Sequence, residues 1–130
     1  MSAQDNAELI RSGYEAFSKG DMETVAKLFS PTISWHISGR SPLAGTYTGH
    51  SEVFGFFGQL MELSGGTFAL EIHDVTSSDD HVIVLVHETA TRGDRHLSNR
   101  EAHVWHLEDG RATEFWGLPE DGYAMDAFWD

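Results

Sequence analysis

The sequence has no cysteine, only eight lysine and arginine residues, and no long apolar run. Without cysteine, the protein has no disulfide bond, thiolate metal ligand or cysteine nucleophile. With 21 acidic residues, its formal net charge is −13, which argues against nucleic acid and anionic membranes as partners because both attract clustered positive charge. The N-terminal region is polar and resembles neither a signal peptide nor a membrane span, so we expect a cytoplasmic protein.

The composition is that of a folded globular protein. Apolar residues make up 40% of the chain and charged residues 22%, values typical of such proteins. A length of 130 residues allows a sizeable core and favours a single domain over residues 1–130. The eight histidines are many for this length, and they gain charge as the pH falls through about 6.5.

Helical spacing of apolar residues predicts three helices in the first half of the chain. The first covers residues 5–19, the second begins after the capping residue Asp21, and the third covers residues 51–63. Residues 33–37 alternate in polarity as a strand does. Residues 39–49 are rich in glycine, proline, serine and threonine and predict a loop long enough to border a cavity.

The second half predicts four antiparallel strands, at residues 67–76, 81–91, 99–107 and 112–118. The strand over 81–91 is apolar on both faces and is therefore predicted to be central. Residues 123–129 form a short segment whose aromatic side chains dock on the rest of the molecule. The expected class is α+β, with a curved sheet that buries one face against the helices. Strong curvature leaves a cone-shaped pocket that the helices do not fill.

One predicted strand carries polar residues on a face that should be buried. Glu101, His103 and Trp105 share this face because side chains alternate along a strand. A polar group on an enclosed face needs a partner or a function. We therefore interpret His103 as a functional residue that Glu101 orients. Alternatively, His103 is a core histidine that hydrogen-bonds to a backbone carbonyl group or to water.

Several short motifs follow one another in a family-specific order. They are Tyr14-Glu15-Ala16-Phe17 leading to Gly20-Asp21, Trp35-His36, Ser41 to Gly45, His103-Val104-Trp105, and Phe115-Trp116. In this order the chain resembles the nuclear transport factor 2-like superfamily, and within it the SnoaL-like polyketide cyclases and the ketosteroid isomerases. The resemblance implies a cone-shaped α+β barrel, with three N-terminal helices packed on a strongly curved, mainly antiparallel sheet.

The resemblance carries over to catalytic positions only in part. His103 falls where ketosteroid isomerases place the acid of their oxyanion hole. The isomerase base falls on Ile37, which cannot accept a proton, and the isomerase tyrosine falls on Gly13, one position before Tyr14. The acid–base aspartate of SnoaL-like cyclases has no clear counterpart on the last strand. Isomerase chemistry of the usual kind is therefore not expected.

We predict an enclosed pocket with His103, Glu101 and His36 as catalytic candidates, His36 only if a bulge turns it inward. The expected substrate-binding residues are Trp35, Ile37, Trp105, Phe115, Tyr14 and Phe57. The favoured function is cofactor-independent acid–base chemistry on a small hydrophobic carbonyl compound, such as cyclisation, isomerisation or dehydration. The alternatives are a non-catalytic binding domain for an apolar metabolite and an epoxide hydrolase that uses Glu101.

Neither a metal nor a cofactor is expected. His87 near Glu101 and His103 would give two histidines and a carboxylate, but the spacing matches no firm metal motif. Val104 and Trp116 are expected on the outer face of the sheet. Apolar residues there favour a homodimer through this face, which is the usual arrangement in the superfamily.

Overall fold

The structure, a computed structural model, describes residues 2–130. Its elements in chain order are α1 (Ala3–Ser18), α2 (Met22–Leu28), β1 (Phe29–Ile37), β2 (Gly45–Thr48), α3 (Gly49–Leu63), β3 (Ala69–Ser77), β4 (His81–Arg92), β5 (Arg95–Glu108), β6 (Arg111–Pro119) and α4 (Gly122–Trp129). The three N-terminal helices and the antiparallel strands of the second half are those predicted from the sequence.

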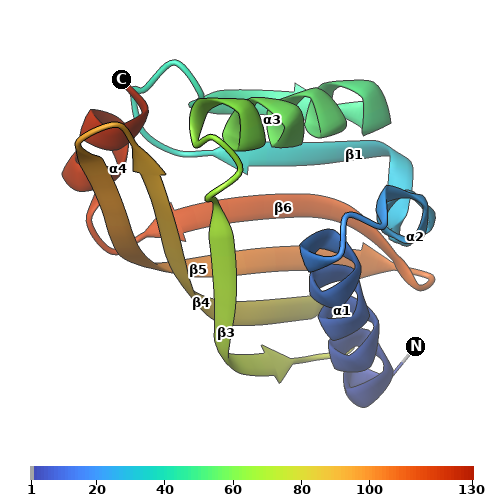
Figure 1. The fold of residues 1–130 in the computed structure, drawn as a ribbon. Helices are drawn as coiled ribbons and strands as arrows, with labels where there is room; N and C mark the ends of the chain where they lie inside the picture. Colours follow the sequence, from blue (N-terminus) through green and yellow to red (C-terminus); the bar gives the residue numbers. More distant parts are fainter. Residues whose placement is uncertain (1) are drawn as a thin grey trace.

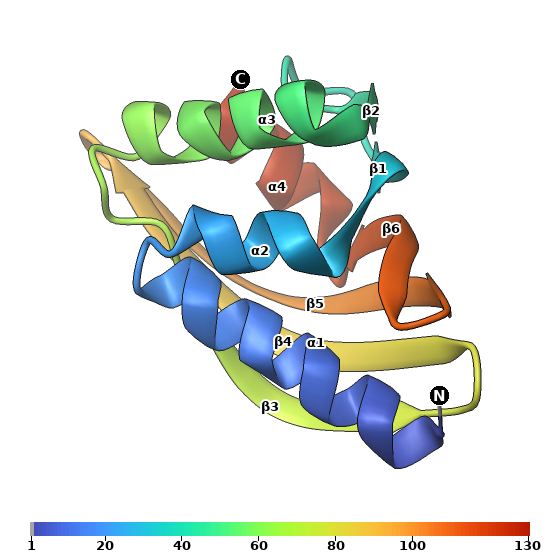
Figure 2. The ribbon, with the colours of Figure 1, turned by 90° about the vertical axis from the view of Figure 1, so that its right-hand side faces the viewer.

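The strands form one curved, unclosed sheet with the order β2-β1-β6-β5-β4-β3. All neighbouring pairs are antiparallel except β1 and β6, which are parallel. The long strands bend around the interior (Figure 1), and α1, α2 and α3 form a layer in front of the sheet (Figure 2). This arrangement confirms the predicted α+β cone with a mainly antiparallel sheet.

The first two helices begin at residues that cap them. Ser2 accepts a hydrogen bond from the backbone of Asp5, whose carboxylate accepts one from Ser2 in return, so a capping box starts α1. Asp21 caps α2, as predicted, by accepting a hydrogen bond from the backbone of Thr24. Gly13 lets the two helices approach closely, because a methyl group at this position would lie 2.6 Å from Leu28 Cδ2.

The predicted loop over residues 39–49 contains a strand that sequence reasoning missed. Residues 45–48 pair with the end of β1, where Tyr47 lies opposite Trp35. The hydroxyl of Tyr47 donates a hydrogen bond to the backbone oxygen of Leu43. The edge of β1 provides backbone partners that make this polar segment extended, although its composition is typical of a loop.

The predicted C-terminal docking segment is a helix, α4, which Asp121 caps. Phe128 and Trp129 are buried, as expected, but Tyr123 is 92% exposed. The reciprocal hydrogen bonds of Asn99 with the backbone of Asp121 hold the start of this helix against β5. In Figure 1, α4 lies at the end of the sheet where the C-terminus is also found.

β4 lies inside the sheet, between β5 and β3, as predicted for a central strand, but only one of its faces is buried. Val82, Val84 and Val86 are buried, whereas Ile83 and Leu85 are 40% and 41% exposed. The strand lies next to the edge strand β3, and the helices cover only the concave side of the sheet (Figure 2). Among residues 2–130, no helix is long and apolar enough to cross a membrane.

Candidate functional site

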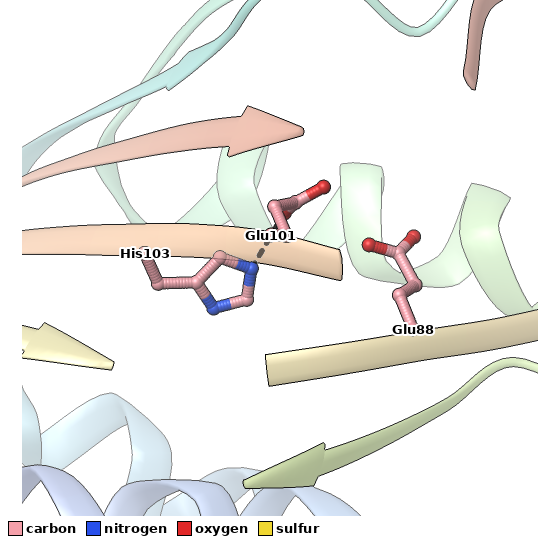
Figure 3. Close-up of side chains that lie close together, drawn as sticks. All are labelled: Glu88, Glu101 and His103. Carbon is pink, nitrogen blue, oxygen red and sulfur yellow. Dashed lines mark hydrogen bonds and ion pairs between the residues drawn. The ribbon is translucent and has the colours of Figure 1, made fainter. Parts of the chain in front are cut away.

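Two neighbouring strands place three ionisable side chains on the concave face of the sheet. Val84 lies opposite His103 and Val86 opposite Glu101, so even-numbered residues of β4 share a face with odd-numbered residues of β5. Glu88 of β4 therefore joins Glu101 and His103 (Figure 3). Each offers a ligand or proton-transfer atom within 4.8 Å of the others. All three are enclosed: Glu88 and His103 are 5% exposed, and the Glu101 side chain is 9% exposed.

A chain of hydrogen bonds crosses His103. Trp105 Nε1 donates to the hydroxyl of Tyr14 at 3.1 Å, and this hydroxyl lies 2.5 Å from His103 Nδ1. His103 Nε2 lies 2.6 Å from Glu101 Oε1. Burial raises the pKa of Tyr14 well above its ordinary value, so the phenol keeps its proton and donates it to Nδ1. We therefore assign the Nε2–H tautomer to neutral His103, which donates to Glu101.

The two buried carboxyl groups differ in ionisation. Burial raises the pKa of Glu88 well above its ordinary value, and the negative charge of Glu101 raises it further. Burial also acts to raise the pKa of Glu101, but the hydrogen bonds with His103 and Glu88, and the positive charge that His103 carries when it is protonated, together outweigh burial and lower this pKa. Near neutral pH, the site therefore combines a neutral carboxylic acid with a carboxylate, an arrangement suited to acid–base chemistry.

The three groups border a cavity of about 100 Å³ on the concave side of the sheet. Its wall is mainly apolar, and the rings of Trp35 and Phe115 stack at a centroid distance of 3.8 Å. Gly117 leaves room for the Glu101 carboxylate, because a methyl group there would lie 3.2 Å from Glu101 Oε1. All the predicted substrate-binding residues line this cavity, namely Trp35, Ile37, Trp105, Phe115, Tyr14 and Phe57.

His36, one of the three predicted catalytic residues, lies elsewhere. No bulge turns it inward: Trp35 faces the cavity opposite Phe115, and His36 faces the other side of the sheet. There, its Nε2 lies 2.7 Å from Glu114 Oε2 and its Nδ1 lies 3.0 Å from Thr46 Oγ1. The structure therefore brings Glu101 and His103 together but separates His36 from them.

Sequence reasoning missed Glu88 and considered its neighbour His87 instead. The alternation that buries Val82, Val84 and Val86 also places Glu88 on the buried face. His87 points to the outer face and hydrogen-bonds to Ser98. The sequence does indicate this position of Glu88, because its carboxylate continues the alternating series of valines that form the apolar face of the strand.

The cluster also has the composition of a metal site. Glu88, Glu101 and His103 each offer one ligand atom. Both ring nitrogens of His103 already have hydrogen-bond partners, so a cation would have to displace either Tyr14 or Glu101 from the imidazole. The hydrogen-bond chain therefore favours proton transfer over metal binding at this site.

Comparison with known proteins gives consistent results. Residues 10–115 match the family described as SnoaL-like domain. An uncharacterised protein of Mycobacterium tuberculosis is 28% identical over 99% of both chains. The structure of Bal32a, from a soil-derived mobile gene cassette, is 40% identical over 98% of both chains, with a TM-score of 0.95. An NTF2-like protein of Burkholderia xenovorans has a TM-score of 0.84 at 18% identity, covering 100% of this chain and 99% of its own.

Proposed function

The chain belongs to the SnoaL-like domain family of the nuclear transport factor 2-like superfamily, and from this membership we propose that it catalyses cofactor-independent acid–base chemistry on a small hydrophobic carbonyl compound. The observation that carries the proposal is the pair of buried carboxyl groups, one neutral and one ionised, beside an apolar cavity. Cyclisation, isomerisation and dehydration of such compounds all begin with, or pass through, proton transfer at a carbon next to a carbonyl group.

In this mechanism, Glu101 is the base and Glu88 is the acid. The Glu101 carboxylate removes a proton from the carbon next to the carbonyl group, and the Glu88 carboxylic acid donates a proton to the carbonyl oxygen, which gives an enol. The two reacting atoms, the carbon next to the carbonyl group and the carbonyl oxygen, are both bonded to the carbonyl carbon. The acid and the base must therefore lie close together, and the carboxyl groups of Glu88 and Glu101 come within 4.8 Å of each other.

His103 acts in this scheme as a positioning residue rather than as the general acid or oxyanion donor expected from the sequence. Its Nδ1 accepts a hydrogen bond from Tyr14 and its Nε2 donates one to Glu101, so neither nitrogen is free for the substrate. The imidazole holds the Glu101 carboxylate in place and stabilises its charge. Tyr14 and Trp105 fix the imidazole in turn.

The size of the cavity restricts the substrate. An engineered apolar cavity of about 150 Å³ in another protein binds benzene, and the cavity here is about 100 Å³. The favoured substrates are therefore short-chain or single-ring ketones and diketones rather than fused polycyclic compounds. The stacked Trp35 and Phe115 rings offer a flat apolar wall for such a molecule.

Hydrogen–deuterium exchange tests the proposed proton transfer without knowledge of the natural product. Small cyclic and open-chain ketones and 1,3-diketones are incubated in D₂O with the protein, and loss of the proton signal next to the carbonyl group is followed by NMR. We expect catalysed exchange, and we expect Glu101→Gln to slow it by about 100-fold or more, as removal of a general base does. Glu88→Gln should also slow the exchange, because the amide cannot deliver a proton.

His36→Gln is the matched control, since His36 lies on the opposite face of the sheet. It should exchange the same ketones at the wild-type rate. If Glu101→Gln catalysed the exchange at the wild-type rate, this result would contradict the role of Glu101 as the base.

The alternative of a non-catalytic binding domain predicts no exchange with any compound, together with an apolar ligand retained in native mass spectrometry. The epoxide hydrolase alternative is also testable, by hydrolysis of a small epoxide in ¹⁸O-labelled water. The arginine next to Glu101 in the sequence, Arg100, is exposed and lies opposite His87 on the outer face, so it does not join Glu101 in the cavity.

A further inference from the structure

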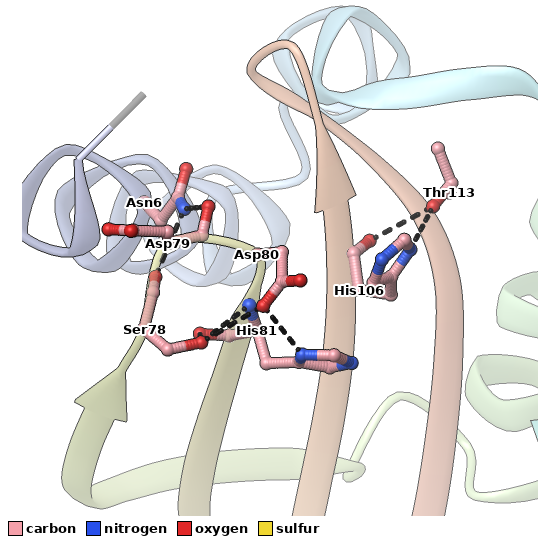
Figure 4. Close-up of polar contacts among 7 residues, drawn as sticks. All are labelled: Asn6, Ser78, Asp79, Asp80, His81, His106 and Thr113. Carbon is pink, nitrogen blue, oxygen red and sulfur yellow. Dashed lines mark hydrogen bonds and ion pairs between the residues drawn. The ribbon is translucent and has the colours of Figure 1, made fainter.

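A second group of ionisable side chains lies on the outer face of the sheet, near one end of β4 and β5. His81 of β4 is directly opposite His106 of β5, and their ring centroids are 4.9 Å apart. Figure 4 shows the two imidazoles on neighbouring strands, next to Asp80 and Thr113. His81 is exposed and His106 is half-buried. Neither lines the cavity that holds the proposed catalytic site.

The hydrogen bond of His81 fixes its tautomer. Its Nδ1 lies 2.9 Å from Asp80 Oδ1. An aspartate carboxyl group is ionised at neutral pH, so Asp80 can only accept a hydrogen bond. The proton of neutral His81 is therefore on Nδ1, and the lone pair is on Nε2.

The same argument applies to His106 through Thr113. The Thr113 hydroxyl has a single proton, which it donates to the backbone oxygen of His106 at 3.3 Å. We therefore assign a proton to His106 Nδ1, which lies 2.9 Å from the Thr113 oxygen and donates to it. Neutral His106 also carries its lone pair on Nε2. Within residues 2–130, neither Nε2 atom has a hydrogen-bond partner.

We propose that His81 and His106 bind a transition-metal dication of the zinc, copper or nickel class through their Nε2 atoms. Neutral imidazole is a preferred ligand of these ions. A histidine ligand commonly donates its other ring N–H to a carboxylate or another oxygen, which orients the ring and strengthens the metal bond. Asp80 and Thr113 have this relation to His81 and His106. Water molecules complete the coordination.

The charge around the pair also favours a cation. Asp79 and Asp80 precede His81, and Glu108 and Asp109 follow His106 in the hairpin turn. The protein as a whole has a formal charge of −13, which attracts cations to its surface. A dication bound by both histidines would link the neighbouring strands β4 and β5.

A zinc titration of the full chain tests the site. Zn²⁺ is added at neutral pH while the side-chain ¹⁵N signals of the histidines are followed by NMR, and the affinity is measured by calorimetry. We expect the Nε2 signals of His81 and His106 to shift together and to saturate at one Zn²⁺ per chain. His81→Gln and His106→Gln should each weaken zinc binding by about tenfold or more. Asp80→Asn should also weaken it, because the carboxylate that accepts the hydrogen bond of His81 Nδ1 is lost.

Two matched variants separate this site from others in the chain. His73→Gln removes an exposed histidine of β3 and should leave the affinity unchanged. His103→Gln alters the buried cluster and should also leave it unchanged. Wild-type affinity in both His81→Gln and His106→Gln would overturn the proposal, and a loss confined to His103→Gln would assign zinc to the buried cluster instead.

Discussion

Glu88 retains a proton in the folded protein that it releases in the unfolded chain. Its ordinary pKa is 4.5, and burial together with the charge of Glu101 raises the pKa well above this value in the folded state. Its contribution to stability is therefore fully present below about pH 4.5 and decreases as the pH rises toward the folded-state pKa, because there the unfolded chain binds fewer protons than the folded protein.

Glu88→Gln should remove this pH dependence. The amide does not titrate, so the free energy of unfolding of the variant should rise relative to the wild type by about 1.4 kcal/mol for each pH unit between the ordinary pKa and the raised folded-state pKa. Urea unfolding of both proteins at about pH 5, 6 and 7 measures the difference. A difference that stays constant over this range would mean that Glu88 is ionised in the folded protein.

Gly13 in α1 and Gly55 in α3 are both helical glycines, but only Gly13 is required by packing. Gly55 lies within α3, is exposed, and a methyl group there would meet no atom within 4 Å. Gly13 lies within α1 and is buried, and a methyl group there would lie 2.6 Å from Leu28 Cδ2. Glycine therefore weakens α3 without a packing benefit, whereas in α1 it permits the contact with α2.

The same substitution should have opposite effects at these two positions. Gly55→Ala should stabilise the protein by about 0.5–1 kcal/mol, because alanine restricts the unfolded chain and favours helix. Gly13→Ala should destabilise it by about 1–3 kcal/mol, because the added methyl group overpacks the contact between α1 and α2. Thermal or urea unfolding gives both values. Equal effects of the two variants would contradict the assigned packing.

At the scale of the whole molecule, the outer face of the sheet carries apolar side chains that the helices leave uncovered. Strand pairing places its side chains in two adjacent rows: Ile83, Val104 and Trp116, and then Leu85, Ala102 and Leu118. Leu85 and Leu118 are 41% and 48% exposed. We propose that a second copy of the chain covers this face in a homodimer, since a contiguous apolar patch of this kind is typical of a protein interface.

Leu85→Glu should disrupt this dimer, because the substitution places a carboxylate within the apolar interface. Multi-angle light scattering should give the mass of a dimer for the wild type and of a monomer for the variant. Tyr123→Glu is the matched control: Tyr123 is 92% exposed but lies on α4, away from the outer face. A monomeric wild type would contradict the proposal, as would a dimer that Tyr123→Glu also disrupts.

The sequence by itself determined the helices, most strands and the faces of β5. Apolar spacing and capping residues are local signals, so α1, α2 and α3 could be predicted. Alternation placed Glu101, His103 and Trp105 on one face, where the structure has them. The same alternation along β4 places Glu88 on the buried face and His87 on the outer face.

Tertiary structure alone decided which residues meet across the chain. Tyr14 lies 89 residues from His103 in the sequence, and only the packing of α1 against the sheet brings its hydroxyl to Nδ1. The formation of β2 likewise depends on the edge of β1, which a local composition cannot reveal. The opposed ionisation of the two carboxyl groups arises because burial and the charge of Glu101 raise the pKa of Glu88, whereas the contact with His103 lowers that of Glu101. Both shifts are properties of the folded interior rather than of either residue.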